Sequence, residues 1–449
     1  MTPAAPPRPP RRFGSLLADP APLRHDRDFR LLWTGQAISV AGRMITSIVL
    51  PYQVYVLTSD LLAVGLLSLV QLVPILAFSL GGGAVADAVD RRRLLLVTQL
   101  GLAGTSLALV LLAMLPAPPV LALFAVAFVS AGLGAVDQPT RASAIPRMVP
   151  PERLPAAIAM NQLVFNGASI IGPAIGGIVL ATAGIAAAYL IDVVTYGAAI
   201  TAVLLISPIP PAPGAVRPSL RSVGEGLRYA RRRRELLATF VVDINAMVFG
   251  SPRSLFPALA LDVFRVGPAG VGLMASAVGV GAFLGAMFSG WTTHVRRPGR
   301  AVIVAVAVWS LGIAGFGLAT FSFQLALLFL AIASGADVIS AVLRSSILQL
   351  LTPDALRGRV SSIHILAVTG GPRIGDAEAS VVAALAGTQL SVVSGGILSL
   401  IGLGAVALGM PELDRLDMAT AEAITAADVA AAEAILAADA APAKVIPPA

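Results

Sequence analysis

The stretch Gly83-Ala-Val-Ala-Asp87-Ala-Val-Asp90-Arg91-Arg92-Arg93 joins two long apolar runs, at 61–85 and 94–115. Each run is long enough for a helix to cross the hydrocarbon core of a bilayer, which takes about 20 residues. Gly83 permits a second helix to approach closely, and the carboxylates and guanidinia after it can form ion pairs at a membrane surface. The stretch therefore predicts a short polar turn between two membrane-spanning helices.

The composition of the whole chain points to lipid as its main solvent. Of the 449 residues, 57% are hydrophobic and only 12% are charged, and the mean hydropathy is +0.87. A soluble domain carries roughly a quarter of its residues as charged side chains, so this chain has too few to cover a water-exposed surface. It contains no cysteine and three scattered histidines, so we expect no disulfide, no metal site and no cofactor.

A polar gap divides twelve apolar runs into two sets of six. The runs cover 31–57, 61–85, 94–115, 119–138, 156–181 and 185–206 before the gap, and 236–261, 268–291, 301–320, 323–343, 360–386 and 389–410 after it. We therefore expect an all-α membrane protein with twelve transmembrane helices in two pseudo-symmetric six-helix bundles. The expected parts are an N-terminal cytoplasmic tail (1–29), a first bundle (30–206), a linker with a basic amphipathic helix (207–235), a second bundle (236–410) and an Ala-rich acidic tail (411–449).

Arginines are confined almost entirely to alternate loops. They lie before the first run, after the second, fourth, eighth, tenth and twelfth runs, and in the central gap, whereas the other loops contain only Arg265. Basic residues near span ends accumulate on the cytoplasmic side of a membrane. We therefore expect a multi-pass protein of the bacterial inner (cytoplasmic) membrane with both termini in the cytoplasm. Retention of these arginines also accounts for the isoelectric point of about 10.6 without a nucleic-acid partner.

The two halves of the chain share motifs at a nearly constant offset. Gly172-Pro-Ala-Ile-Gly-Gly177 corresponds to Gly371-Pro-Arg-Ile-Gly-Asp376, and Arg141, which precedes Pro151, corresponds to Arg344, which precedes Pro353. Such a pattern indicates a duplicated six-helix unit. Repeated units of this kind are typical of transporters whose substrate site lies between two bundles that move about it.

Several segments together resemble the major facilitator superfamily over residues 25–410. They are the loop around Asp87, the start Asp28-Phe29-Arg30-Leu31-Leu32-Trp33, the stretch Asp137-Gln-Pro-Thr-Arg141-Ala-Ser-Ala-Ile-Pro146 and Gly358-Arg359-Val360. Within the superfamily, the chain is similar to the enterobactin-exporter branch and its drug-efflux-like relatives. It departs from the usual signature loop at Ala88, where a basic residue is usual, and at Asp90, where glycine is usual.

The resemblance implies that the signature loop takes part in gating. Asp87 would face the start of the eleventh span, and Arg91 or Arg92 would pair with an acid on the fourth span, with Asp137 as the candidate. The alternative is that these arginines only anchor lipid headgroups. The expected gating residues are Gly83, Asp87, Asp90, Arg91, Arg92, Asp137 and Arg141.

The fifth span carries a second motif that resembles one associated with export members of the superfamily. Its residues are Gly167, Gly172, Pro173, Gly176 and Gly177. Pro173 removes a backbone donor and the glycines permit a kink and close helix contact. Ordinary packing of small residues remains the alternative to a direct role in export.

Charged residues inside the spans are the strongest functional signal, because they are costly in hydrocarbon and normally face a cavity or a partner. Arg373 and Asp376 are three residues apart and could neutralise each other on one helix face. A carboxyl in a partly dry cavity can exchange protons during transport, whereas the alternative is a static ion-pair network. The proton-coupling candidates are Asp376, Glu378, Asp337 and Asp243, and the substrate-cavity candidates are Arg43, Arg373, Arg253, Asp192 and Tyr196.

Together these features predict a secondary active exporter working by alternating access and proton antiport. Its cargo would be a small amphipathic or aromatic metabolite, a siderophore or drug-like natural product, and its other partners would be protons and the lipid bilayer. The resemblance implies a monomer. An ATP-driven pump is excluded, since a phosphate-binding loop needs a lysine and the only lysine, Lys444, lies in the C-terminal tail. No catalytic triad or metal-ligand cluster suggests an enzyme; the alternative is a non-transporting membrane sensor or assembly factor on the same scaffold.

Overall fold

The computed structural model describes residues 19–210, 228–231, 233–352 and 354–417, with the side chains of 79–88, 354–355, 357–359 and 362 left out. Most of both tails and most of the amphipathic helix expected in the linker lie outside these residues. The described part of the chain consists of helices and their connections and contains no strand.

The first half of the chain forms one short helix and six long ones. The short helix is α1 (Ala21–His25), and the long helices are α2 (Arg27–Thr58), α3 (Leu61–Ala88), α4 (Arg91–Ala113), α5 (Val120–Ala144), α6 (Leu154–Thr182) and α7 (Gly184–Leu205). Two 3-10 turns, η2 (Ile145–Arg147) and η3 (Pro151–Arg153), connect α5 to α6. Prolines begin or interrupt both turns, which fits their loss of regular helical hydrogen bonds.

The second half forms five long helices after a first span that is broken. That span consists of α9 (Arg234–Phe249), the 3-10 turn η4 (Arg253–Leu255), α10 (Phe256–Ala258) and the π-helical turn η5 (Leu259–Val263). Gly250 and Pro252 lie at the break, and both disfavour a continuous helix. The remaining elements are α11 (Pro268–Met287), η6 (Ser289–His294), α12 (Pro298–Leu318), α13 (Phe323–Leu351), α14 (Asp354–Ala386), α15 (Thr388–Gly409) and α16 (Pro411–Arg415).

Eleven helical segments of the described residues are long and apolar enough to cross a membrane. The helix α14, with 33 residues, is the twelfth long segment, but it is more polar because it carries Arg373, Asp376 and Glu378. It packs beside α3, α9 and α15 inside the molecule. The expectation of an all-α membrane protein built on about twelve spanning helices is confirmed, and the charges of α14 explain why it alone falls short on apolarity.

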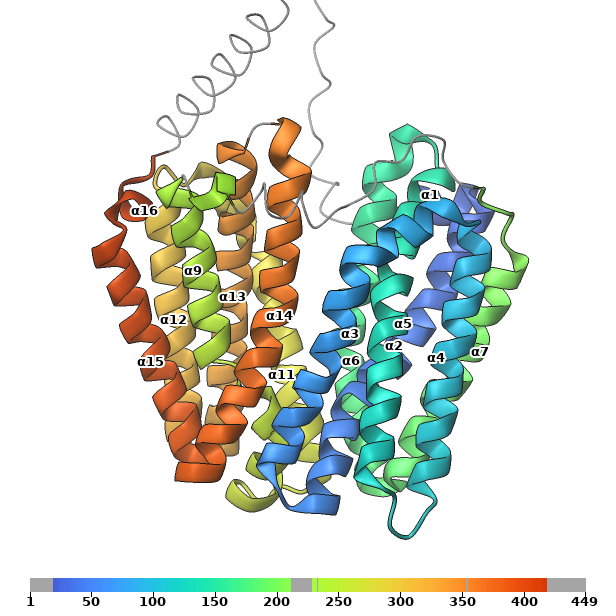
Figure 1. Ribbon diagram of the computed structural model, residues 1–449, viewed down its shortest axis with the longest axis horizontal. Coiled ribbons are helices and arrows are strands. Elements are labelled where there is room, and N and C mark those ends of the chain that lie inside the picture. The colour runs from blue at the N-terminus through green and yellow to red at the C-terminus, as the bar shows by residue number, and fades with distance from the viewer. Residues whose placement is uncertain (1–18, 211–227, 232, 353, 418–449) are drawn as a thin grey trace, which may run out of the picture.

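The long helices gather into two bundles (Figure 1). Helices α2 to α7 form one bundle, and α9 and α11 to α15 form the other. We call the end of the molecule that carries α1 and α16 the linker end, and the opposite end the far end. Toward the far end the bundles are joined by α6 with α11, α3 with α14, and α2 with α10 and α11, whereas their ribbons stand apart toward the linker end (Figure 1).

Tight turns at the far end repeat between the halves. Gly184, between α6 and α7, and Gly387, between α14 and α15, both have positive φ angles, of 84° and 91°. Glycine adopts this left-handed region without the steric cost that other residues meet there. The two turns occupy equivalent places in the two six-helix units, as the repeated sequence motifs predict.

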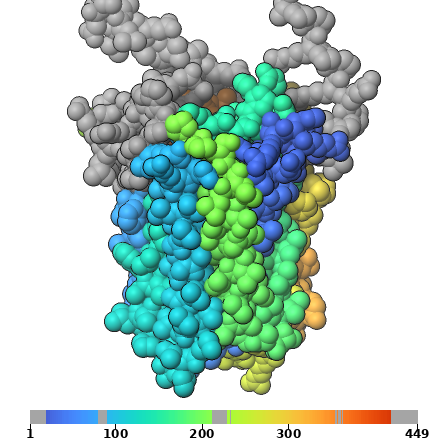
Figure 2. Space-filling model, turned by 90° about the vertical axis from the view of Figure 1, so that its right-hand side faces the viewer, coloured from blue at the N-terminus to red at the C-terminus, as the bar shows by residue number. Residues whose placement is uncertain are grey.

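The outer face of the first bundle is apolar. Figure 2 shows α4 and α7 side by side on this face. Large hydrophobic side chains of both helices lie on the surface, among them Val97, Leu107 and Leu111 of α4 and Leu190 and Val194 of α7. An apolar surface of this extent marks contact with a partner or a membrane, and on a bundle of spanning helices it is the lipid-facing side.

Candidate functional site: charged clusters inside the bundles

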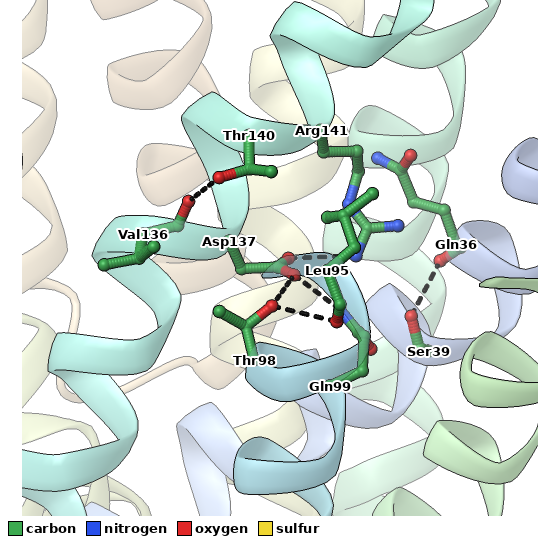
Figure 3. A network of polar contacts seen from close by, with 9 residues as sticks. All are labelled: Gln36, Ser39, Leu95, Thr98, Gln99, Val136, Asp137, Thr140 and Arg141. Atoms are coloured by element: carbon green, nitrogen blue, oxygen red, sulfur yellow. Dashed lines mark hydrogen bonds and ion pairs between the residues drawn. The ribbon is translucent and has the colours of Figure 1, made fainter. Parts of the chain in front are cut away.

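A buried carboxylate organises the linker-end half of the first bundle (Figure 3). Asp137 of α5 is 1% exposed and accepts hydrogen bonds from Thr98, at 2.8 Å, and Gln99, at 2.7 Å, both on α4. Its ion pair is with Arg141, whose Nη2 lies 2.9 Å from Oδ2. The two residues are four apart on one helix, so they share a face. The structure therefore corrects the expectation that Arg91 or Arg92 supplies the ion pair of Asp137.

The arginines of the signature loop, Arg91 and Arg92, form hydrogen bonds with the ends of neighbouring helices. Arg91 donates to Ser143 Oγ of α5, at 3.0 Å, and to the carbonyl of Pro210, at 3.3 Å. Arg92 donates to the carbonyl of Val203 near the end of α7, at 3.0 Å. Unpaired carbonyls at a helix C-terminus attract cations, so Arg92 caps α7 as well as extending from α4.

Asp90 begins α4, and its carboxylate accepts hydrogen bonds from the backbone N–H groups of Arg92, at 2.8 Å, and Arg93, at 3.2 Å. It is therefore the N-cap of α4. Gly83 and Asp87 lie in the last turns of α3, and the expected contact of Asp87 with the start of α14 lies outside the described side chains.

A second buried carboxylate links α7 to its neighbours. Asp192 is 1% exposed and accepts hydrogen bonds from Thr46 of α2 and Ser106 of α4, each at 2.7 Å. A Cβ at Gly42 would lie 2.8 Å from Asp192 Oδ1, so α2 reaches this carboxylate only because glycine stands there. The second oxygen, Oδ1, has no hydrogen-bond partner among the described residues.

Arg43 lies between the two carboxylates of the first bundle. It is half-buried, midway along α2, and its guanidinium acts electrostatically on both Asp137 and Asp192. Tyr196, one turn beyond Asp192 on α7, is 3% exposed. The structure thus brings three of the expected cavity residues, Arg43, Asp192 and Tyr196, to one region, with Tyr196 packed into it.

The second bundle contains a triad that sequence reasoning identified only in part. Arg344 of α13 is 4% exposed, and its Nη2 lies 2.8 Å from Oδ1 of Asp243 on α9 and 3.8 Å from Oδ1 of Asp337 on α13. Asp243 and Asp337 are among the expected proton-coupling residues, but Arg344 is not. The available signal was its correspondence to Arg141 in the repeat; the structure adds that α13 extends to Leu351, beyond the apolar run at 323–343.

Several buried polar atoms of the triad lack a hydrogen-bond partner among the described residues. They are Asp243 Oδ2 and Arg344 Nε and Nη1. Asp337 lies midway along α13, yet 35% of its side-chain surface is exposed. A side chain so placed in a spanning helix reaches an internal water-accessible space, since a carboxylate is not tolerated against lipid at this depth.

A third expected carboxylate, Asp376, lies where the bundles meet. It is 7% exposed and accepts hydrogen bonds from Ser68 Oγ of α3, at 3.0 Å, from Ser251 Oγ, at 3.3 Å, and from the backbone N–H of Ser254, at 3.2 Å. Ser68 belongs to the first bundle and the other two serines to the second. We call Asp376 and these three serines the far-end latch.

Arg373 also crosses between the bundles. Its Nη1 donates to Gln71 Oε1 of α3, and the carboxylate of Asp376 accepts its hydrogen bonds from the latch serines. The two opposite charges are close enough to act on each other, as their spacing allowed, but they form no direct ion pair among the described residues. Glu378 is half-buried and turns away from the latch, and Arg253 is exposed on η4. A further cross-bundle hydrogen bond, from Tyr55 to Asp262, lies at the same end.

The glycine motif of α6 serves two different contacts. Gly172 and Gly176 pack against α2, where an added Cβ would lie 2.5 Å from Met44 Cβ and 3.1 Å from Ile48 Cδ1 respectively. Gly177 packs against α11 of the other bundle, where an added Cβ would lie 2.9 Å from Gly272 Cα. Gly167, by contrast, has open space around it. The motif therefore packs α6 within its own bundle and against the opposite one.

We expect Ser68→Ala to loosen the latch. A hydrogen bond to a charged group contributes about 1.5–3 kcal/mol, so losing it should favour separation of α3 from α14 by roughly tenfold or more. The cysteine-free chain allows a single Ala377→Cys label beside α3, and its rate of maleimide labelling in the purified protein should rise accordingly. Ser47→Ala is the matched control, because Ser47 bonds only to Met44 of its own helix. Equal labelling rates in the two variants would contradict a role for the latch.

This architecture, with paired helix bundles and charged clusters at mid-membrane depth, defines a multi-pass secondary transporter of the major facilitator class. The chain belongs to the transmembrane secretion effector family, whose model matches residues 18–441. It is a transporter and not an enzyme, and the expected place in the major facilitator superfamily is confirmed.

Curated relatives include enterobactin exporters. The enterobactin exporter EntS of Shigella boydii serotype 18 is 29% identical over 358 residues, which cover 78% of this chain and 83% of that protein. The enterobactin exporter EntS of Citrobacter koseri is 28% identical over 391 residues, covering 85% of this chain and 90% of that protein. The expected resemblance to this branch is confirmed.

Solved structures share the fold at low identity. A POT family transporter in complex with 5-aminolevulinic acid has a TM-score of 0.69 and 14% identity, covering 87% of this chain and 97% of that one. A bacterial homologue of the iron transporter ferroportin in an inward-facing state has a TM-score of 0.66 and 14% identity, covering 86% and 98%. At this identity the likeness shows the fold alone.

Proposed function

We propose that the protein exports a small amphipathic or aromatic metabolite, a siderophore or drug-like natural product, by alternating access and in exchange for protons. Its similarity to proteins named enterobactin exporters supports the class of cargo. The observation that carries the mechanism is the triad of Asp243, Arg344 and Asp337, in which two carboxylates share one guanidinium inside the membrane.

The orientation that we propose places the linker end in the cytoplasm of a bacterium, with the protein in the inner membrane as a monomer. Arginines gather at the helix ends that lie toward the linker end: Arg91 begins α4, Arg147 and Arg153 lie between α5 and α6, Arg297 precedes α12 and Arg415 ends α16. Arg265 lies between η5 and α11, which connect at the far end. The bias of basic residues toward the cytoplasm supports this placement.

The contacts that join the two bundles at the far end are of a kind that can form and break repeatedly during transport. They include glycine contacts between α6 and α11, the far-end latch, and hydrogen bonds from Arg373 to Gln71, from Ser276 to the carbonyl of Ile170 and from Tyr55 to Asp262. The helix contacts are made by small residues and the polar contacts are single hydrogen bonds, so two rigid bundles could separate there at modest cost. With the far end joined, cargo would enter from the linker end, and opening of the far end would release it outward.

The triad is the proton site that the contacts favour among the candidate carboxylates. Two carboxylates and one guanidinium leave one excess negative charge, which is costly to bury and which one bound proton would cancel. Asp337 is the proposed acceptor, since it is the more distant partner of Arg344 and the more exposed one. Among the described residues, Arg253 on η4 and His364 on α14 also interact electrostatically with the triad, and Arg253 is exposed, so water screens it.

Arg43 is the proposed contact for an anionic group of the cargo. It is half-buried midway along α2, and it forms no hydrogen bond or ion pair with Asp137 or Asp192 among the described residues, although its charge acts on both. A guanidinium presented in this way can bind a carboxylate or catecholate in bidentate fashion.

Transport assays in inverted membrane vesicles test the proposal, with enterobactin as the probe cargo. Accumulation should require an acidic lumen and should stop when a protonophore collapses the gradient. Asp337→Asn imitates the protonated carboxyl permanently, so it should abolish gradient-driven accumulation while cargo exchange between the two sides continues. Asp414→Asn, which removes an exposed acid of α16, is the control and should accumulate cargo normally.

Two outcomes would contradict this proposal. Accumulation independent of the proton gradient would exclude antiport, and a fully active Asp337→Asn variant would exclude the triad as the proton site. Binding of cargo without any flux, together with a phenotype on deleting residues 411–449, would favour the sensor or assembly factor.

A further inference from the structure

A cavity on the membrane-facing side of the second bundle lies away from the charged clusters described above. It has a volume of about 440 Å³ and is lined by η6, the first half of α12 and the middle of α13. Its floor consists of the small residues Ala301, Ala305 and Ala336, and its rims include Trp291, Val304 and Ile339. Trp291 and Val304 are 51% and 57% exposed, so the cavity opens outward and not toward the other bundle.

The cavity has one charged end and one apolar end. Arg297 and Arg300 line it at the linker end, where α12 begins, and the apolar lining continues from there to Val308. A helix rises 1.5 Å per residue, so the stretch from Arg297 to Val308 spans about 16 Å, which is about half of the roughly 30 Å hydrocarbon core. The groove therefore has the depth of a single leaflet.

The charges at its mouth are unbalanced. Arg296, Arg297 and Arg300 are all exposed there. Within the part of the chain that the structure describes, their one ion pair joins Arg300 to Asp414 at 3.9 Å, with both side chains largely exposed. Exposed pairs of this length contribute little, so Arg300 can exchange its partner for a phosphate. Basic pockets of this kind between membrane-spanning helices bind anionic lipid headgroups.

We propose that this groove is a binding site for an anionic phospholipid of the leaflet at the linker end. One acyl chain lies along Ala301, Ala305 and Val308, and the phosphate lies between Arg297 and Arg300. The apolar length, the position of the guanidinia at the headgroup level and the outward opening fit a lipid molecule better than a water-soluble anion, which would have no use for the apolar part.

Quenching of tryptophan fluorescence by brominated lipids tests the site, because Trp291 stands on its rim and the chain has only three tryptophans. The full-length protein is placed in phosphatidylcholine vesicles with an increasing fraction of phosphatidylglycerol brominated on its acyl chains. Phosphatidylglycerol should quench at a lower mole fraction than equally brominated phosphatidylcholine. A Trp291→Phe variant should lose most of this quenching.

Two variants separate the headgroup contact from the acyl contact. Each arginine near a membrane surface contributes about fivefold to the affinity for an anionic lipid, so Arg297→Gln with Arg300→Gln should weaken the preference for phosphatidylglycerol by at least about fivefold. Arg296→Gln removes one neighbouring charge that does not line the groove, so it should weaken the preference less than either Arg297→Gln or Arg300→Gln alone. Ala305→Phe fills the floor and should reduce quenching by both lipids.

The proposal is overturned if the double arginine variant keeps the wild-type preference, if both lipids quench equally in the wild type, or if Trp291→Phe leaves the quenching unchanged. Failure of Ala305→Phe to fold would not affect these tests, because the arginine variants change only exposed side chains.

Discussion

Replacing Arg344 by glutamine should destabilise the folded protein by about 3–5 kcal/mol, the usual cost of removing one partner from a buried ion pair. Its guanidinium is 4% exposed and lies within 4 Å of both Asp243 and Asp337. Without it, two carboxylates would be left close together in the second bundle. Thermal unfolding of the detergent-purified protein measures the effect, and Arg296→Gln provides the control because Arg296 is exposed.

A second substitution makes this prediction specific to charge. Asp243→Asn combined with Arg344→Gln removes both charges of the closer ion pair, with asparagine isosteric with aspartate and glutamine shorter than arginine. Because replacing both partners of a buried pair is often nearly neutral, the double variant should recover most of the lost stability. If it is as unstable as Arg344→Gln alone, packing of the arginine, and not its charge, holds the triad together.

Placing a methyl group at Gly272 should prevent closure of the far end. A Cβ there would lie 2.4 Å from the carbonyl oxygen of Pro173 and 2.7 Å from Gly177 Cα, both in the backbone of α6. Neither helix can yield by rotating a side chain, so the bundles must move apart. Overpacking of this kind costs about 1–3 kcal/mol, and we expect Gly272→Ala to reduce the transport rate about tenfold or more.

Gly167→Ala is the matched control for this experiment. It lies in the α6 motif that Gly272 packs against, but no atom stands within 4 Å of the position where its Cβ would be. Its transport rate should remain close to that of the wild type. Equal losses in the two variants would mean that helix flexibility, and not the contact between α6 and α11, accounts for the glycines.

The sequence was sufficient for the helical architecture because its signals are local. Spans follow from the length of apolar runs, and the repeat follows from matched motifs such as Gly172–Gly177 and Gly371–Asp376. The sequence was less informative about breaks within a spanning helix. The run at 236–261 reads as one span, but the structure divides it after Phe249, where Gly250 and Pro252 interrupt the helix.

The partners of the buried charges were the part that could not be deduced. Spacing shows which residues share a face of one helix, but not how that helix is rotated toward its neighbours. Arg373 and Asp376 share a face, yet Arg373 donates to Gln71 on another helix. The reverse holds for Asp137, whose partner Arg141 lies on its own helix, four residues away. Spacing also could not show that Arg344 pairs with acids of two helices, Asp243 of α9 and Asp337 of α13.

The polarity of α14 constrains how the protein is assembled during synthesis. A charged residue near the centre of a spanning helix raises the free energy of insertion by about 2.5–3.5 kcal/mol on the translocon scale, and α14 carries Arg373, Asp376 and Glu378 in its second half. It therefore gains little by entering lipid alone. Its charges are accommodated by α3 and α9, which are made earlier, and its follower α15 is strongly apolar. Insertion of α14 and α15 as a hairpin against a partly built molecule would satisfy both requirements.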